Sequence, residues 1–323
     1  MSRARAYTNI ALVKYWGKRD SQQMLPFNSS LSLTLDQFYT ETSVTFVDDV
    51  ADQFYLDGEV QPVSAKITHV IDLVRAQSGL QKAALIRSDN HVPNAAGLAS
   101  SASAFAALAL AASTAAGLKL SRRELSILAR HGSGSASRSI YGGFVVWHAG
   151  QDDQSSFAEP AIANTEQVDF PIAILAVLVD QSQKKVSSSA GMAASVATSP
   201  FYPVWARTAE AAIPKMTAAI AAKAVDKIGA LAETNAMQMH ATTLSADPPF
   251  TYFEPETLKI WEKVREIRRK GLNCYVTLDA GPNPKLICQL QDVEKIIHEF
   301  QKEFPNLTFT SCRPGPGAYL VNE

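Results

Sequence analysis

The sequence predicts an α+β protein in two parts, and three observations lead to this fold class. Segments that read as strands and segments that read as helices are mixed along the 323 residues without strict alternation. After Asp180 the character of the chain changes to a polar stretch and then to a long alanine-rich helical region. A chain of this length also buries a large core and commonly forms one or two domains. We therefore expect an N-terminal part at 1–180 and a C-terminal part at 181–323.

The first part begins with several expected strands. Leu31, Leu33 and Leu35 alternate with two polar residues, which predicts a half-buried strand. Asp57-Gly58 is a turn signal between two further strands. The expected strands are 6–18, which turns polar toward its end, 31–35, 40–47, 53–56 and 59–63.

A helix is expected next, because Ile67, Val70, Ile71 and Val74 are spaced like one helix face and Gly79 closes the pattern.

Two more helices and two strands complete the first part. An alanine-rich helix is expected at 101–116, and Ser121 with Glu124 predicts a capping box for the helix after it. The apolar segments 144–147 and 172–179 read as strands, and we expect the second to be buried on both faces.

The second part is helical first and mixed later. The expected helices are 192–244, 255–270 and 292–304, and the expected strands are 274–279, 286–289, 307–311 and 318–321. A turn at 280–284, Ala-Gly-Pro-Asn-Pro, joins the first two of these strands.

Composition excludes some classes of partner. The formal net charge is −1, so neither a nucleic acid nor an anionic membrane is expected as a bulk partner. An anionic substrate would instead need a local cluster of basic residues. Cys274, Cys288 and Cys312 are odd in number and far apart, which favours small buried hydrophobes in a reducing cytosol over a disulfide framework. No signal peptide or membrane span is expected.

A loop of small residues at 92–103 predicts an anion site. It lies between an expected strand at 84–86 and the expected helix at 101–116, where free backbone N–H groups and the positive end of the helix dipole converge. Small side chains allow a phosphate chain to approach the backbone. No Gly-Lys-Ser/Thr follows, so the loop is not a Walker motif. A simple turn that caps a buried helix is the structural alternative.

Four blocks of sequence carry a resemblance to a known family. Pro93-x-x-x-Gly97-Leu98-x-Ser100-Ser101-x-Ser103 resembles the phosphate loop of the GHMP kinases, which are ATP-dependent enzymes of small molecules. Within them, segments 9–20, 132–139 and 277–283 resemble the mevalonate diphosphate decarboxylases, including those of bacteria. The matches follow the family's order from near residue 8 to near residue 320. The resemblance implies a two-lobed GHMP kinase fold with the active site in the cleft between the lobes, and a cytoplasmic homodimer.

The resemblance implies a nucleotide site with ATP and Mg²⁺. The ATP-binding residues it implies are Asn94, Ala96, Gly97, Leu98, Ala99, Ser100, Ser101, Ser103 and Lys184. Mg²⁺ is expected on phosphates, water and one or two protein oxygens, with Ser100 and Asp279 as candidates.

Three charged residues match the family's catalytic positions. Asp279 precedes a tight turn and is implied to orient the substrate hydroxyl or accept its proton; an Asx turn is the structural alternative. Lys14 is implied to hold Asp279 ionised; a solvated lysine at a strand end is the structural alternative. Arg138 is implied to bind a carboxylate or phosphate through two hydrogen bonds; an arginine that caps a helix or loop is the structural alternative.

Other residues match positions that hold the substrate. These are Tyr15, Lys18, Ser133, Ser135, Ser188 and Ser189, together with Arg138. Ser188 and Ser189 follow a polar stretch, 181–189, which we expect to act as a mobile lid with a helix N-terminus near Ser187. Many bacterial relatives carry arginine where this chain has Ser189, which leaves the local phosphate contacts in doubt.

The implied reaction is the ATP-dependent decarboxylation of (R)-5-diphosphomevalonate (mevalonate 5-diphosphate) to isopentenyl diphosphate, with ADP, phosphate and CO₂ as the other products. The alternatives are a kinase of the same fold that stops at the phosphorylated alcohol, a decarboxylase of mevalonate 5-phosphate, and an inactive nucleotide-binding protein on the same scaffold. The joint presence of Lys14, Arg138 and Asp279 favours the decarboxylase.

Overall fold

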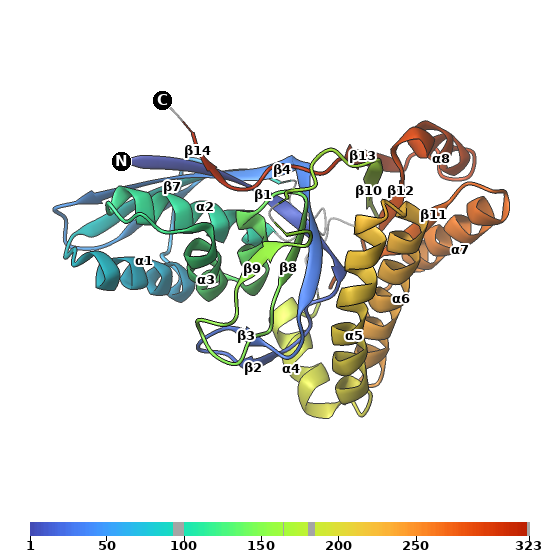
Figure 1. The fold of residues 1–323 in the computed structure, drawn as a ribbon, viewed down its shortest axis with the longest axis horizontal. Helices are drawn as coiled ribbons and strands as arrows, with labels where there is room; N and C mark the ends of the chain where they lie inside the picture. The colour runs from blue at the N-terminus through green and yellow to red at the C-terminus, as the bar shows by residue number, and fades with distance from the viewer. Residues whose placement is uncertain (93–99, 164, 180–184, 322–323) are drawn as a thin grey trace.

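Two antiparallel-rich sheets and the helices that cover them make up the chain (Figure 1). The computed structural model describes residues 1–92, 100–163, 165–179 and 185–321. The larger sheet has eight strands in the order β14-β1-β4-β7-β5-β6, with β8 beside β4 and β9 beside β8. Its strands are β1 (Ser2–Val13), β4 (Ser30–Val47), β5 (Gln53–Leu56), β6 (Glu59–Gln61), β7 (Ala83–His91), β8 (Phe144–Trp147), β9 (Ala158–Pro160) and β14 (Tyr319–Leu320).

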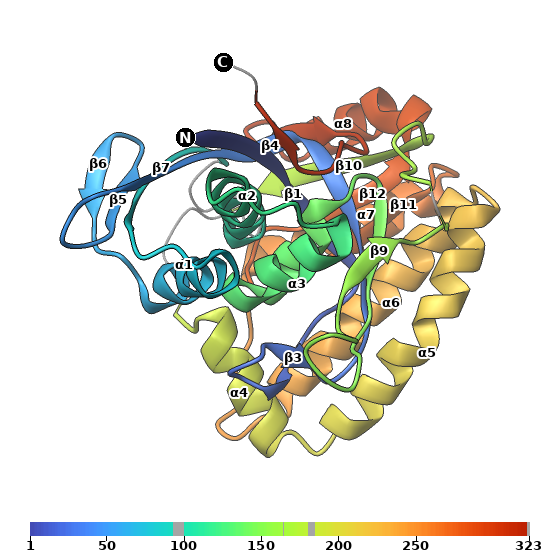
Figure 2. The same ribbon diagram turned by 60° about the vertical axis from the view of Figure 1, so that its left-hand side comes forward.

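Helices α1 (Ala65–Ser78), α2 (Ser100–Ala115) and α3 (Arg122–Gly132) lie together against the larger sheet (Figure 2). Local signals mark both ends of α1 and the start of α3 as the sequence predicts. The Ser64 side chain accepts from the Ile67 amide at the start of α1, and Gly79 at φ 75° ends it. Six alanines of α2 are completely buried, since small side chains allow the helix to approach β1 and β4 closely. A 3₁₀ helix, η1 (Gly134–Ile140), follows α3.

The smaller sheet has the order β11-β12-β10-β13, and its strands are β10 (Ile172–Leu178), β11 (Cys274–Thr277), β12 (Lys285–Gln289) and β13 (Thr308–Cys312). Strand β10 is buried on both faces, as its apolar run predicts. Ile172 and Ile174 pack in the core that contains α5 and α6, whereas Ala173 and Leu175 pack in the core that contains α7 and α8.

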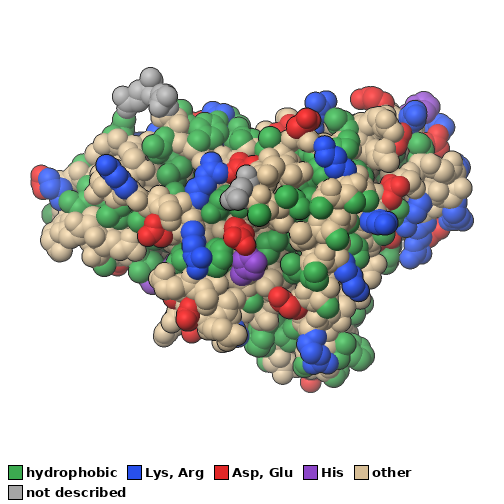
Figure 3. Space-filling view, viewed as in Figure 1, with side chains coloured by type: hydrophobic (Ala, Val, Ile, Leu, Met, Phe, Trp, Pro, Cys, Tyr) green, Lys and Arg blue, Asp and Glu red, His purple; other side chains and the backbone are tan. Residues whose placement is uncertain are grey.

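Five helices and a small hairpin complete the structure. The helices are α4 (Ser188–Thr198), α5 (Tyr202–Ala221), α6 (Val225–Leu244), α7 (Pro255–Arg269) and α8 (Val293–Gln301), with a 3₁₀ turn, η2 (Leu290–Asp292), before α8. The expected helical region at 192–244 is thus three helices. Strands β2 (Lys18–Asp20) and β3 (Leu25–Pro26) form the hairpin. Figure 3 shows lysine and arginine side chains gathered at the end where α7 and α8 lie, with acidic side chains among them, and Lys270 pairs there with Glu266 and Glu299.

One expected strand differs in length and burial. Residues 31–35 and 40–47 belong to the single 18-residue strand β4, and its polar residues Ser32 and Thr34 are buried as well. The prediction of a half-buried strand is wrong because both faces are covered. The leucines pack in the core with α5 and α6, while the Thr34 hydroxyl donates to the Tyr141 carbonyl at 2.9 Å.

Both sheets take a strand from across the division expected at residue 181. Strand β14 lies near the C-terminus but pairs with β1, with Arg5 opposite Tyr319. Strand β10 precedes residue 181 but pairs with β12 and β13. Cys274, Cys288 and Cys312 are buried and free, as expected, and burial raises the pKa of each thiol. Among the described residues, no helix is both long and apolar enough to cross a membrane.

Candidate active site

A cavity of about 310 Å³ lies where β1, η1 and the start of α2 meet the start of α4 and the turn after β11. It therefore receives side chains from both the larger and the smaller sheet and their helices. Eleven of the residues predicted from the sequence line it: Lys14, Tyr15, Lys18, Ser100, Ser101, Ser133, Ser135, Arg138, Ser188, Ser189 and Asp279.

Lys14 and Asp279 form an ion pair across this cavity. Lys14 follows the last residue of β1, and its Nζ lies 2.7 Å from Oδ1 of Asp279, just beyond β11. The lysine side chain is 2% exposed and the aspartate side chain 26%, so the pair is shielded on the lysine side and open on the aspartate side. Burial lowers the pKa of Lys14, and the carboxylate of Asp279 opposes this shift.

The backbone of Lys14 is also fixed in place. Its amide donates to Oδ1 of Asn235 in α6 at 2.7 Å, and its carbonyl accepts from Nδ2 of Asn28 at 2.9 Å. The ammonium makes a further hydrogen bond to the Ala11 carbonyl at 2.8 Å. Helix α6 and strand β1 together thus hold Lys14 against Asp279.

Arg138 is a buried cation held by neutral groups. Its Nη1 donates to the Ser30 hydroxyl at 2.5 Å, and Nε and Nη2 donate to Oδ1 of Asn9 at 3.4 and 3.3 Å. Among the described residues, no carboxylate lies within ion-pair distance of its guanidinium. Burial lowers the pKa of Arg138 to about 10, and Asp279 opposes this shift. A desolvated guanidinium that remains charged at neutral pH attracts an anion strongly.

A row of hydroxyl groups lines another side of the cavity. The Ser133 hydroxyl lies 3.2 Å from that of Ser101, at the N-terminus of α2, and 3.3 Å from that of Ser135. Tyr15 packs edge-on against Trp147, with the ring centroids 4.8 Å apart. Burial raises the pKa of the Tyr15 phenol, which keeps this group a neutral donor. Burial lowers the pKa of Lys18. Together these groups offer hydrogen-bond donors around a site that also contains cations, as a polyanion requires.

Two family models and several characterised relatives match nearly the whole chain. Residues 6–158 match the model described as diphosphomevalonate decarboxylase-like N-terminal domain, and residues 174–314 match that of the mevalonate 5-diphosphate decarboxylase C-terminal domain. The diphosphomevalonate decarboxylase of Ganoderma lucidum is 35% identical over 94% of this chain and 82% of its own length. The chain belongs to the diphosphomevalonate decarboxylase family. The family resemblance of the four sequence blocks is thereby confirmed.

Solved structures of diphosphomevalonate decarboxylases superpose on this chain. The enzyme from Staphylococcus aureus has a TM-score of 0.94 at 43% identity, covering 99% of this chain and 98% of that one. The structure described as MDDEF in complex with MVAPP, AMPPCP and magnesium has a TM-score of 0.93 at 45% identity, covering 100% of this chain and 99% of that one. The α+β, two-lobed fold of the GHMP kinases is confirmed by these similarities.

One residue predicted for the site, Ser103, lies away from the cavity, and several others are outside the described residues. Ser103 is fully buried, its hydroxyl lies 2.8 Å from that of Thr40, and it donates to the Ser100 carbonyl, so the structure places it inside the lobe and not at the cavity. The expected ATP-binding residues Asn94, Ala96, Gly97, Leu98, Ala99 and Lys184 lie outside the described residues. Of the expected lid, residues 185–189 are described, and Ser187 caps α4 as predicted by accepting from the Ala190 amide.

Two polar residues that line the same cavity were missed by sequence reasoning. Asn9 positions Arg138, and its Nδ2 also donates to the Ser135 carbonyl at 3.0 Å and to the Ser139 hydroxyl at 2.8 Å. It stands at the start of a recognised block, but an asparagine in a strand gives no signal of its own. Lys66, in the first turn of α1, lines the cavity and contributes to lowering the pKa of Lys18. Its sequence context indicates only a helix.

The donor set suits a magnesium ion that is held mainly by substrate oxygens. Ser100 and Asp279 both line the cavity and supply a hydroxyl and a carboxylate. Among the described residues, no group of three or more His, Cys, Asp and Glu side chains is placed to bind a metal. Mg²⁺ keeps several waters and binds phosphate oxygens together with one or two protein ligands, and one hydroxyl and one carboxylate match that requirement.

A second cavity, of about 320 Å³, adjoins the first at the start of α2. Ser100 and Ser101 line both cavities. The walls of the second are largely apolar and include Phe54, Ile67 and Phe105 from β5, α1 and α2. An apolar cavity beside hydroxyl groups at a helix N-terminus suits a flat apolar group joined to a phosphate chain.

Proposed function

We infer that this chain catalyses the ATP-dependent decarboxylation of (R)-5-diphosphomevalonate to isopentenyl diphosphate, releasing ADP, phosphate and CO₂. The observation that carries this conclusion is the placement of the Lys14–Asp279 pair beside the buried Arg138 in one cavity. Membership of the diphosphomevalonate decarboxylase family over nearly the whole chain supports it.

The reaction needs activation of a poor leaving group. The C3 hydroxyl of the substrate is tertiary and leaves readily only after phosphorylation. We propose that Asp279 accepts a hydrogen bond from this hydroxyl and takes up its proton as the γ-phosphoryl group of ATP is transferred. Lys14, 2.7 Å away, keeps the carboxylate ionised and stabilises negative charge on the transferring group.

The second half of the reaction forms the double bond. When the C3–phosphate bond breaks, positive charge grows at C3. The C1–C2 bond then breaks, its electron pair forms the new double bond, and CO₂ leaves. Asp279, whose side chain is 26% exposed, first releases the proton it took up to solvent. Its carboxylate next to C3 then stabilises the growing positive charge, which gives Asp279 a second role in the same position.

The substrate anions require separate partners. We propose that Arg138 binds the C1 carboxylate, since a planar guanidinium matches two carboxylate oxygens. The diphosphate is assigned to the other side of the cavity. The residues proposed to hold it are Tyr15, Lys18, Ser133, Ser135, Ser188 and Ser189.

We propose that ATP spans the two adjoining cavities. Its phosphates are assigned to the segment 93–99 and to Ser100 and Ser101, and its base to the cavity that Phe54 and Phe105 line. Magnesium, when bound, neutralises phosphate charge, and Ser100 and Asp279 are its proposed protein ligands. Ser103 is not retained as a nucleotide contact because its hydroxyl is bonded inside the lobe.

The test compares mevalonate, its 5-phosphate and its 5-diphosphate, each labelled at C1, and measures ADP and CO₂ together. Equal amounts of both products, with the diphosphate strongly preferred, are expected. ADP without CO₂ would make the chain a kinase. Preference for the monophosphate would show that the enzyme is a decarboxylase of mevalonate 5-phosphate.

Assembly, compartment and lobes are also proposed. We propose a homodimer, based on the family resemblance, which light scattering of the purified protein tests directly. We propose a cytoplasmic location, supported by three free, buried cysteines. The two parts, 1–180 and 181–323, are proposed as lobes, with β10 of the first part in the sheet of the second and β14 of the second part in the sheet of the first. Limited proteolysis near residue 181 tests this division.

A further inference from the structure

The hairpin β2–β3 carries two residues of the cavity wall, Lys18 and Met24. Its strands have only three and two residues, and they pair at Lys18 with Pro26 and at Asp20 with Leu25. Isolated hairpins are marginal in water even with longer strands. Met24 also has φ 55°, a left-handed conformation that is uncommon for a residue other than glycine. Contacts from outside the hairpin must therefore hold it.

Arg130, in α3, makes a hydrogen bond that reaches the hairpin from inside the protein. Its side chain is 0% exposed, and its Nε donates to the Gln23 carbonyl at 3.1 Å. The other guanidinium nitrogens bind the loop between β8 and β9, through the Asp153 carbonyl at 3.0 Å, the Ser156 carbonyl and the Asp153 carboxylate. One buried guanidinium thus joins helix, loop and hairpin.

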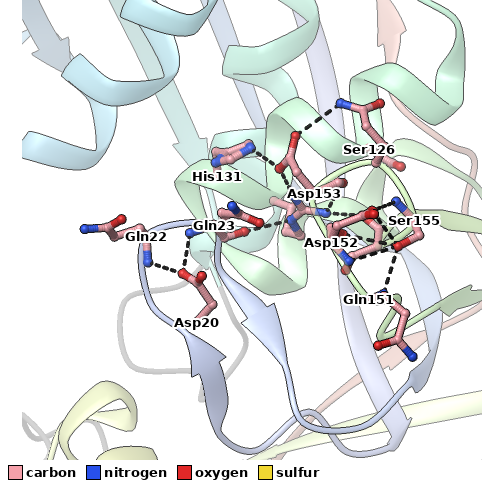
Figure 4. A network of polar contacts seen from close by, with 12 residues as sticks. Asp20, Gln22, Gln23, Ser126, His131, Gln151, Asp152, Asp153 and Ser155 are labelled. Atoms are coloured by element: carbon pink, nitrogen blue, oxygen red, sulfur yellow. Dashed lines mark hydrogen bonds and ion pairs between the residues drawn. The ribbon is translucent and has the colours of Figure 1, made fainter.

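The hairpin and the loop are each braced by further hydrogen bonds. Oδ1 of Asp20 accepts from the amides of Gln22 and Gln23 at 2.8 and 2.9 Å, and Nη2 of Arg19 donates to the Gly150 carbonyl at 2.6 Å. Figure 4 shows Asp20, Gln22 and Gln23 on the hairpin beside the loop residues 151–155. Arg19 and Asp20 belong to the sequence block 9–20, and the proposed reaction gives them no role.

We propose that Arg130 is a positioning residue, which fixes the β2–β3 hairpin and thereby places Lys18 at the diphosphate end of the cavity. The inference rests on the proposed function, since that function assigns Lys18 to the diphosphate. Only a guanidinium has enough N–H donors, pointing in enough directions, to bind three carbonyls and a carboxylate at once. Lysine has one nitrogen and cannot reach all of these groups.

The test is a double-mutant cycle on Arg130→Met and Lys18→Met, with Arg123→Met as matched control. Arg123 lies on the same helix, donates to the Gln154 carbonyl of the same loop at 3.1 Å and stacks on Phe157. Among the described residues it makes no hydrogen bond to the hairpin. Each of the two test substitutions should raise KM for the diphosphate substrate by about 10- to 100-fold with little change in kcat, the range for losing one charge-assisted hydrogen bond.

The double variant decides between positioning and independent effects. If Arg130 acts through Lys18, the double variant has the same KM as Lys18→Met alone. If the two increases multiply, or if Arg130→Met changes KM no more than Arg123→Met does, the proposal is wrong. If Arg130→Met fails to fold, Asp20→Ala takes its place in the cycle with Lys18→Met, because it removes the two hydrogen bonds that Asp20 accepts in the same turn.

Amide hydrogen exchange separates this inference from the proposed function. In the ligand-free protein, the amides of residues 18–26 should exchange faster in Arg130→Met than in Arg123→Met, without a general increase elsewhere. Unchanged exchange in the hairpin refutes the positioning role even if the enzyme is active. A wild-type protein that does not turn over the diphosphate refutes the proposed function, while the exchange result still stands.

Discussion

The substitution Asp279→Asn is the most direct perturbation of the proposed chemistry. It keeps the size and one hydrogen-bond acceptor of the side chain but removes its charge and its capacity to take a proton. Lys14 is 2% exposed and loses the carboxylate that pairs with it, so its pKa falls further below the ordinary lysine value. The variant thus lacks the base and has a weaker cation beside the transferring phosphoryl group.

The magnitude follows from these two losses. A positioned general base contributes about 10²- to 10⁴-fold to the rate. A charge-assisted hydrogen bond contributes about 1.5–3 kcal/mol, or roughly another ten-fold or more. We therefore expect kcat to fall by at least about 10³-fold, which corresponds to about 4 kcal/mol in the barrier. Binding of both substrates should persist, because neither the proposed carboxylate clamp nor the hydroxyl row is touched.

The assay is single-turnover formation of ADP and CO₂, with substrate binding measured separately by calorimetry. Asp52→Asn is the matched control, since Asp52 also pairs with a largely buried arginine, Arg75, but lies outside the cavity. The control should change stability and leave kcat near the wild-type value. A folded Asp279→Asn protein with kcat within ten-fold of wild type would refute the role assigned to Asp279.

Three further predictions concern other parts of the structure. Arg138→Lys should lower kcat/KM by about 100-fold or more, because an ammonium cannot form the two-pronged contact, and steady-state kinetics that match wild type would reject the clamp. Gly17→Ala should destabilise the protein by about 2 kcal/mol or more in urea unfolding, since Gly17 has φ 108° and an added Cβ would lie 1.9 Å from the Tyr202 hydroxyl oxygen; an unchanged midpoint would contradict this. Cys274 and Cys288 should react with a thiol reagent only as the protein unfolds, because burial raises both pKa values, that of Cys288 to about 12, and fast reaction of the native protein would show the thiols to be accessible.

Much of the secondary structure follows from short-range patterns. The capping box of Ser121 and Glu124 marks the start of α3, and Gly79 marks the end of α1, because each signal acts over three or four residues. The uninterrupted apolar run of β10 likewise predicts a strand covered on both faces. These features depend on neighbours in the chain, and neighbours are what a sequence displays.

The candidate site was predictable from motifs, but its organisation was not. Lys14 and Asp279 are 265 positions apart, and no local pattern indicates that their side chains meet. The contribution of Asn9 to holding Arg138 depends on η1 packing beside β1. The outward position of Ser101 and the inward position of Ser103 depend on which face of α2 meets the sheet.

By itself the sequence determined the fold class, most helices and strands, and the family, and it predicted the aspartate, lysine and arginine that we propose as catalytic. Tertiary structure alone decided that β14 joins β1, that β10 belongs to the smaller sheet and that Arg130 ties the hairpin of Lys18 to α3. The physical reason is the range of the interactions. Capping, periodicity and turns are fixed by residues a few positions apart, whereas strand pairing and buried ion pairs depend on segments that only folding brings together.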